Sequence, residues 1–410
     1  MGKIAVGHLW HFYQPPWQTD YWISRISEEC YAPVTEWLLR NPEFRVAVNI
    51  NNSLVRHFER LSLSGIIDNL GSAADAGTVE FTGSSAYHAL LPTLLSSHSG
   101  GEGEVRRQIE LNEEGNRKVF GTSWNPAGFF PPEAAFSAEL AKTIKAAGYR
   151  FAITDAVIFD SANPGKSIPH SEVGTVEGLP VFFRSGWSNE FTISRPGRKD
   201  YNLSRYVSDL KRATEGWFNG KGGHLSLAYD VETIGHHIRP YRERLDEYAG
   251  AFEASGIRPE HFSRILEEFP GRPELRTNPG SWSTTKEDIA AGNPFPLWDS
   301  PRNPVHSALK EATAVAIESV HRSAASRALA PEEYLSARDK LDRGLQSCKE
   351  WWANPPGQYS PANIRAGAGL LFGAIRDAGA ALSGEAGKYR EIAEACSRKL
   401  EEAIGKLGGG

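Results

Sequence analysis

Short runs of almost wholly apolar residues alternate with longer mixed segments over the first 230 residues of the chain. Runs without polar alternate positions are typical of parallel strands that are buried on both faces. One mixed segment, residues 133–150, has a helical pattern that closes on a glycine before the next run begins. Repeated strand and helix predict a βα barrel or an open doubly wound sheet. The expected strands are KIAVGHLWHF (3–12), FRVAVNI (44–50), TVEFTG (78–83), RFAITDA (150–156), LPVFFRS (179–185) and HLSLAYDVE (224–232).

The pattern changes after residue 300, where apolar positions recur at the period of an α-helix. We predict amphipathic helices there that pack into a C-terminal helical bundle. Residues 269–304, rich in proline and glycine, separate the two parts, and their aromatic residues favour a packed loop. We therefore expect a βα domain over residues 1–300 and a helical domain over 301–410. The helical stripes are Val305, Leu309, Ala312, Ala316 and Val320; Leu341, Leu345, Cys348 and Trp352; Ile364, Ala368, Leu371 and Ile375; and Tyr389, Ile392, Cys396, Leu400 and Ile404.

Charge and cysteine content narrow the class of protein. The net charge is −5 and lysine and arginine are spread along the chain, so we expect no nucleic-acid partner and no anionic membrane surface. No apolar stretch is long enough to cross a bilayer. Cys30, Cys348 and Cys396 have no framework spacing and the N-terminus has no secretory pattern, which predicts a cytoplasmic location. A neutral or weakly charged substrate fits this composition best.

The stretch GTSWNPAGFFPPE, residues 121–133, ends in one carboxylate after two phenylalanines and two prolines. Stiff backbone and apolar neighbours hold a carboxylate in a fixed place, as a nucleophile requires. The same residues fit a simpler interpretation, in which Phe129 and Phe130 end a core strand and Glu133 begins the next helix. On this stretch alone both interpretations stay open.

A second pair of acids follows an apolar strand. The segment HLSLAYDVETIGHH (224–237) places Asp230 and Glu232 two residues apart, so both point to the same side. Two like charges repel, which favours protonation of one of them at neutral pH and so supplies a general acid. Barrel active sites lie at strand ends of this kind, although a solvated strand end is the alternative. Glu133 and one acid of this pair would together supply the two carboxylates that glycoside hydrolysis requires.

Four stretches follow one another along the chain, in the order HFYQPP (11–16), GTVEFTGSSAYHALLP (77–92), GFFPPE (128–133) and YDVETIG (229–235). They resemble the N-terminal conserved motifs of glycoside hydrolase family 57. The resemblance covers residues 4–236 by motif and the helical tail by architecture. It implies a retaining enzyme acting on α-glucans, built on an irregular (β/α)7 barrel followed by helices. We expect neither a cofactor nor a metal ion.

The resemblance also implies roles for single residues. It places the nucleophile at Glu133 and the general acid/base at Asp230, whose carboxyl groups should lie about 5 to 5.5 Å apart if configuration is retained. His11 and Gln14 would bind sugar hydroxyls. Further substrate-binding positions are Glu80, His88, Glu232 and His236.

The fifth motif of the family is matched less well. In LDRGLQSCKEWWANP (341–355), Trp351 and Trp352 resemble the family's aromatic segment, whereas Cys348 and Lys349 stand near where asparagine and aspartate are common. We expect Trp351 to face the sugar and Trp352 to pack in the core. Among the tryptophans in loop-like text, we assign sugar binding to Trp124 and Trp298.

The expected reaction is hydrolysis of α-1,4-glucans of the α-amylase type, through a covalent glycosyl-enzyme. A 4-α-glucanotransferase or a branching enzyme uses the same steps with a sugar as the acceptor, and the sequence does not separate these. A glucan-binding relative without turnover and a metal-dependent polysaccharide deacetylase are the alternatives from other classes. Against the deacetylase, His8 and His11 are three apart on a strand and face opposite sides. Oligomeric state and preferred linkage stay open.

Overall fold

Seven parallel strands close into a barrel in the computed structural model, which describes residues 2–192, 203–327 and 330–408. The strand order is β2-β3-β4-β5-β7-β8-β1, and β1 also pairs with β2, which closes the ring. The (β/α)7 barrel with a helical C-terminal region is confirmed, and the open doubly wound sheet is excluded. The barrel strands are β1 (Ile4–Phe12), β2 (Val46–Ile50), β3 (Val79–Gly83), β4 (Gly128–Phe129), β5 (Phe151–Asp155), β7 (Leu179–Arg184) and β8 (Gly223–Asp230).

All six strands expected from apolar runs are present, and the pattern missed the seventh. β4 has only two residues, Gly128 and Phe129, which is too short for a periodic signal. Among the described residues, four further short strands lie outside the ring. β6 (Thr175–Val176) pairs antiparallel with β7, and β9 (Ile257–Pro259) pairs with the start of β1. β10 (Ala353–Asn354) and β11 (Gln358–Tyr359) pair antiparallel with each other.

One end of the barrel is closed by an aromatic side chain. Phe262, at the start of α13 (Phe262–Glu268), is fully buried inside the strands against Phe151 and Phe182. A Cβ at Gly7 would lie 2.5 Å from its ring, so only glycine leaves room for it on β1. α13 follows β9, which pairs with Ile4–Val6, so this plug fills the end where the strands begin.

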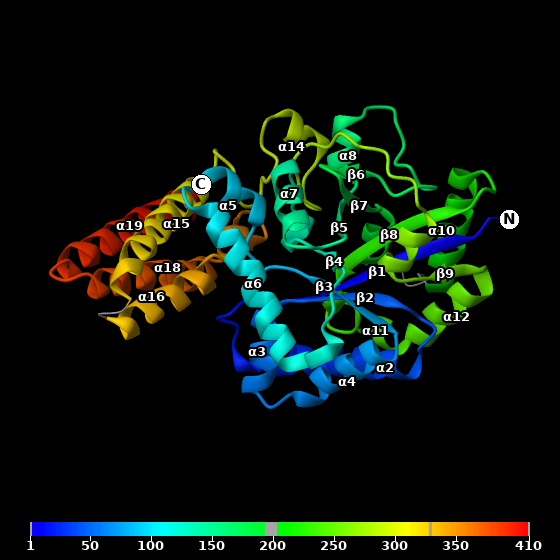
Figure 1. Cartoon of the computed structure of the whole chain (residues 1–410), viewed down its shortest axis with the longest axis horizontal. Helices are drawn as coiled ribbons and strands as arrows, with labels where there is room; N and C mark the ends of the chain where they lie inside the picture. Colours follow the sequence, from blue (N-terminus) through cyan, green and yellow to red (C-terminus); the bar gives the residue numbers. More distant parts are fainter. Residues whose placement is uncertain (1, 193–202, 328–329, 409–410) are drawn as a thin grey trace.

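Helices surround the strands (Figure 1). Those in the first half of the barrel region are α1 (Asp20–Ile26), α2 (Ala32–Arg40), α3 (Asn52–Arg60), α4 (Ser64–Asp75), α5 (Leu91–Ser97), α6 (Gly101–Phe120) and α7 (Ala138–Ala146). Those that follow are α8 (Val157–Ala162), α9 (Trp187–Thr192), α10 (Leu203–Phe218), α11 (Arg239–Glu243), α12 (Leu245–Ser255), α13 and α14 (Lys286–Ala290).

The C-terminal helices gather at one end of the molecule, with α5 and α6 between them and the strands (Figure 1). Their buried apolar side chains belong to the same hydrophobic cluster as those of β5, β7 and α7. The division into domains at residue 300 therefore stays a prediction. The helices are α15 (Pro304–Ser323), α16 (Pro331–Gly344), α17 (Cys348–Trp351), α18 (Pro361–Ala381) and α19 (Ala386–Gly408).

The stripe from Leu341 to Trp352 does not form one helix as expected. α16 ends at Gly344, Gln346 forms a β-bridge with Ala89, and α17 begins at Cys348. A Cβ at Gly344 would lie 2.9 Å from Leu371, so α18 packs closely against this turn. Among the described residues, no helix combines the length and apolarity needed to cross a membrane.

Candidate active site

A cleft of about 820 Å³ opens at the carboxyl end of the barrel strands. Glu133 and Asp230 both line it, so the structure brings the two expected catalytic acids into one cavity. The helical region contributes one wall through Cys348, Trp351 and Trp352. His11, Gln14, His88, Glu232 and His236 also line the cleft.

Glu133 sits on a tightly held turn directly after β4. It lies in the 3-10 turn Pro132–Ala134, where Glu133 has φ 61° and Ala134 has φ 50°, a region that L-residues avoid. Three backbone carbonyls of the segment accept hydrogen bonds from neighbouring groups. The Ser84 hydroxyl donates to Phe130 O, the backbone N–H of Trp282 donates to Glu133 O, and the Thr154 hydroxyl donates to Ala134 O. Two consecutive residues in this conformation persist because the surroundings fix them, a feature typical of functional sites.

The Glu133 side chain has one clear hydrogen-bond donor. Trp282 Nε1–H donates to Oε2 at 2.7 Å, while Oε1 faces His88 Nδ1 at 4.0 Å, outside hydrogen-bond range. The side chain keeps 15% of its surface exposed, so it can be reached from the cleft. Burial, and then the charge of Asp230, raise the pKa of Glu133 to about 8, and the Trp282 hydrogen bond opposes this shift.

Asp230 is placed by the register of the sheet. It is the last residue of β8 and lies directly beside His11 of β1. Burial raises the pKa of Asp230 to about 6, and the nearby guanidinium of Arg184 opposes the shift. Arg184 is itself fixed, because it donates to Ala228 O, to Asp155 and to Asn189.

Glu133 and Asp230 therefore share an environment that disfavours two charges. Each carboxyl is desolvated, and the negative charge of Asp230 raises the pKa of Glu133. In the free cleft the charge rests more readily on Asp230, since Arg184 is near it. Near neutral pH the pair is thus expected to hold one proton between the two carboxyls.

Glu232 forms a separate polar cluster at the side of the cleft. Tyr31 and Gln14 both donate to its Oε1, Gln14 at 3.0 Å. Burial, and then the charge of Asp230, raise the pKa of Glu232 to about 8. Gln14 is in turn held by Gln18, whose amide donates to Gln14 Oε1. The cluster fixes the Gln14 amide, which lines the cleft beside the acids.

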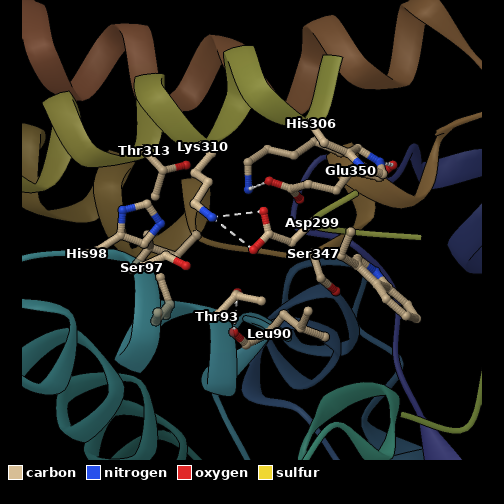
Figure 2. A pocket seen from close by; sticks show the side chains of 14 residues that line it. Leu90, Thr93, Ser97, His98, Asp299, His306, Lys310, Thr313, Ser347 and Glu350 are labelled. Carbon is tan, nitrogen blue, oxygen red and sulfur yellow. Dashed lines mark hydrogen bonds and ion pairs between the residues drawn. The ribbon is translucent and has the colours of Figure 1, made fainter. Parts of the chain in front are cut away.

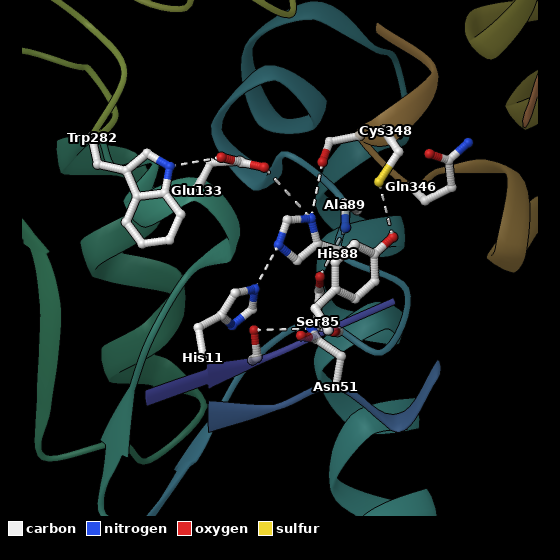
Figure 3. A network of polar contacts seen from close by, with 12 residues as sticks. His11, Asn51, Ser85, His88, Ala89, Glu133, Trp282, Gln346 and Cys348 are labelled. Carbon is white, nitrogen blue, oxygen red and sulfur yellow. Dashed lines mark hydrogen bonds and ion pairs between the residues drawn. The ribbon is translucent and has the colours of Figure 1, made fainter. Parts of the chain in front are cut away.

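Two histidines form a short polar chain that runs from β1 to the side of Glu133 (Figure 3). His11 Nε2 lies 3.1 Å from His88 Nε2, and His88 Nδ1 lies 3.0 Å from Ser347 Oγ. Tyr13 stacks on the His88 ring with centroids 3.9 Å apart. Burial lowers the pKa of His11 to about 4 and that of His88 further, so both rings are neutral at physiological pH.

Aromatic side chains line much of the cleft. Trp17, Trp22, Trp282, Trp351 and Trp352 all border it. Trp351 and Trp352 meet edge to face with centroids 4.7 Å apart, so Trp352 contributes to the cleft as well as to the core. His236 pairs with Glu29 at 2.6 Å and lies near Trp22. Flat aromatic faces of this kind suit the apolar faces of sugar rings.

Three residues with an expected substrate role lie elsewhere. Glu80, on β3, is only partly buried and accepts the backbone N–H of Ser263 in the first turn of α13. Trp124 is fully buried against Phe81 and Phe120.

Trp298 is also buried, and it lines a separate cavity of about 40 Å³ between α5, α15 and α17. Figure 2 shows this cavity, with Lys310 paired to Asp299 beside it. Loop position and residue type alone had suggested a sugar contact for Trp124 and Trp298, but packing against the neighbouring helices takes both away from the cleft.

The comparison with protein families agrees with the motifs. The model of glycosyl hydrolase family 57 matches residues 7–250, more than half of the chain. The chain belongs to this family. An α-amylase of Pyrococcus horikoshii is 31% identical over 156 residues, which cover 38% of this chain and 23% of that protein. An α-amylase of Dictyoglomus thermophilum is 26% identical over 151 residues, 37% of this chain and 21% of that protein. The matched part is thus a little over a fifth of each relative's length.

Solved structures share the fold of this family 57 chain over nearly its whole length. A branching enzyme from Pyrococcus horikoshii superimposes with a TM-score of 0.68 at 16% identity, covering 98% of this chain and 94% of that one. A 4-α-glucanotransferase from Thermococcus litoralis gives a TM-score of 0.70 at 17% identity, covering 92% and 60%. At these identities the likeness establishes the fold.

The sequence did not single out several residues of this family 57 protein that line the cleft or contact the residues lining it. Trp282 was one of several loop tryptophans, and nothing in its neighbours marked it as the partner of a glutamate 149 positions away. Arg184 carried a usable signal, a cation that closes an apolar strand. Tyr13 lay inside the first motif, and Ser347 inside the fifth. Among the described residues there is no group of three or more His, Cys, Asp or Glu arranged to hold a metal ion.

Proposed function

We propose that the protein is a retaining glycosidase that cleaves α-1,4-glucans through a covalent glycosyl-enzyme. The observation that carries the proposal is that Glu133 and Asp230 line one cleft and share a desolvated environment. Two carboxyl groups that hold one proton between them are what a retaining mechanism needs. The family's α-amylases and the aromatic lining of the cleft support a glucan substrate.

In the proposed first step, Glu133 attacks the anomeric carbon while Asp230 protonates the departing glycosidic oxygen. This requires the proton on Asp230 and the charge on Glu133, the reverse of the free cleft. A glycosidic oxygen next to Asp230 accepts a hydrogen bond from the protonated acid and so raises its pKa. Trp282 meanwhile stabilises the ionised form of Glu133. Substrate binding thus favours the reactive arrangement.

In the second step, ionised Asp230 takes a proton from the acceptor, whose oxygen attacks the anomeric carbon and releases Glu133. If the acceptor is water, the enzyme is a hydrolase of the α-amylase type. If it is a sugar hydroxyl, the enzyme is a 4-α-glucanotransferase or a branching enzyme. The transglycosylase is the second candidate, because the branching-enzyme fold extends over 98% of this chain, including the helical wall of the cleft.

The test is incubation with amylose and with single maltooligosaccharides. We expect new reducing ends, and product NMR at early times should give the α-anomer. Redistributed oligomers without net reducing ends would assign a glucanotransferase, and new α-1,6 signals a branching enzyme. Binding to glucan without any of these products would refute turnover and leave the binding relative.

A further inference from the structure

Asn49 lies in a row of polar side chains that crosses the cleft end of the barrel. Asp230, His11, Asn49 and Thr82 are aligned in register on the neighbouring strands β8, β1, β2 and β3. Asn49 is fully buried and does not border the cleft, and it lies outside the motif stretches. It contacts His11, however, and His11 leads through His88 to Glu133.

The surroundings of Asn49 decide which way its amide points. Its Nδ2 lies 3.0 Å from Thr82 Oγ1 and 3.4 Å from the backbone carbonyl of Gly83. A carbonyl can only accept, so the NH2 group must face Gly83 and Thr82. The Asn49 carbonyl oxygen is then the atom 2.7 Å from His11 Nδ1.

We propose that Asn49 is a positioning residue that fixes the tautomers of His11 and His88, so that His88 presents an unprotonated Nδ1 towards Glu133. Because Asn49 Oδ1 accepts, His11 carries its proton on Nδ1 and leaves Nε2 as an acceptor. His88 must then donate from Nε2 at 3.1 Å, which leaves its Nδ1 as an acceptor for the Ser347 hydroxyl. Figure 3 shows His88 between His11 and Glu133.

The consequence concerns the charge on the proposed nucleophile, and in this respect the inference rests on the proposed function. A proton on His88 Nδ1, 4.0 Å from Glu133 Oε1, would stabilise the carboxylate and lower its nucleophilicity. If His88 Nδ1 carries a lone pair instead, it donates nothing to Glu133, and the side-chain donor to Glu133 is Trp282 Nε1–H. The other titratable groups that act on Glu133 are Asp230 on β8, and Tyr13 and Cys348, which hydrogen-bond to each other.

The variant Asn49→Asp should reverse the direction of the hydrogen bond between His11 and His88, with little change in the shape of the side chain. The new carboxylate favours a doubly protonated His11, which donates from Nε2. His88 Nε2 must then accept, so the His88 proton moves to Nδ1, next to Ser347 and Glu133. An N–H at that place favours ionised Glu133, so the Glu133 carboxyl should titrate at lower pH, by about one unit.

The experiment is NMR on full-length protein with 15N-labelled histidine and 13C-carboxyl-labelled glutamate. His11→Gln and His88→Gln assign the two imidazoles, and Glu133→Gln assigns the carboxyl. In the parent we expect neutral Nδ1–H for His11 and neutral Nε2–H for His88 at pH 7. In Asn49→Asp we expect an imidazolium at His11, Nδ1–H at His88 and the downward shift of the Glu133 titration.

Asn52→Asp is the matched control. It places the same charge at another buried asparagine, on α3, whose side chain hydrogen-bonds to Asn116 and Arg56. Parent histidines with the opposite tautomers would overturn the assignment. A tautomer change in Asn49→Asp that leaves the Glu133 titration unmoved would overturn the effect on the nucleophile. These readouts need no turnover, so failure to cleave any glucan would refute the proposed function and not this inference.

Discussion

The two proposed catalytic carboxyls are held by opposite kinds of structure. Glu133 follows a strand of two residues and sits in a turn with two consecutive positive φ angles. Asp230 ends a regular strand of eight residues and is aligned with His11 on the next strand. Sheet register alone places Asp230, whereas Glu133 needs stiff prolines and long-range contacts such as that of Trp282. A nucleophile that forms a bond must be placed more narrowly than a group that transfers a proton.

The largest loss of activity should come from a change at Glu133, the carboxyl held by the strained turn. Glu133→Gln keeps the size of the side chain and removes the attacking charge, so kcat should fall by roughly four orders of magnitude or more. Rates on maltooligosaccharides at saturating substrate measure this. Glu318→Gln, an exposed position on α15, makes the same change away from the cleft and serves as the control. Full activity in Glu133→Gln would refute the assignment of the nucleophile.

Asp230→Asn should reduce the rate less than Glu133→Gln does. The size of the reduction should depend on the leaving group. General acid catalysis contributes about 10²- to 10⁴-fold, and most of it is lost on a natural glucan. A nitrophenyl maltooligoside leaves without protonation, so its first step should stay fast while the second slows. Intact-mass measurement should then show a glycosyl adduct on Glu133. Equal losses on both substrates, with no adduct, would argue against a proton-transfer role.

Trp282→Phe probes how the turn controls the charge of Glu133. The change keeps a ring but removes the N–H that donates to Oε2. Loss of a hydrogen bond to a charged group costs about 1.5–3 kcal/mol, or roughly 10- to 100-fold in kcat/KM. The missing donor also raises the pKa of Glu133, so the acidic limb of the pH profile should move to higher pH.

The control for this prediction is Trp124→Phe, which removes an equivalent N–H from Glu113 of α6, and neither residue lines the cleft. It should lower stability and leave the acidic limb in place. If both variants moved the limb equally, the shift would reflect a general loss of packing and not the contact to Glu133.

The same contrast explains what could be predicted from the sequence. Long apolar runs that are buried on both faces signal strands directly, and an acid at the end of such a run, Asp230, can be found from local pattern. β4 is too short to show any periodic pattern. Only the prolines and Glu133 that follow it indicate that this segment has a functional role. Which loop tryptophan reaches the acid depends on tertiary packing, so Trp282, Trp124 and Trp298 looked alike until the fold placed them.

The smallest predicted effect isolates the backbone strain itself. Ala134 and Ala135 are both fully buried, but Ala134 has φ 50° and Ala135 has φ −71°. Each change to glycine loses one methyl group, about 0.8 kcal/mol, and adds chain entropy to the unfolded state. Only Ala134→Gly also relieves a left-handed conformation, which costs roughly 1–2 kcal/mol for an L-residue. Ala134→Gly should therefore be the more stable of the two by that amount in urea unfolding. Equal stabilities would mean that the turn holding Glu133 stores no strain, and that its side-chain contacts alone position the carboxylate.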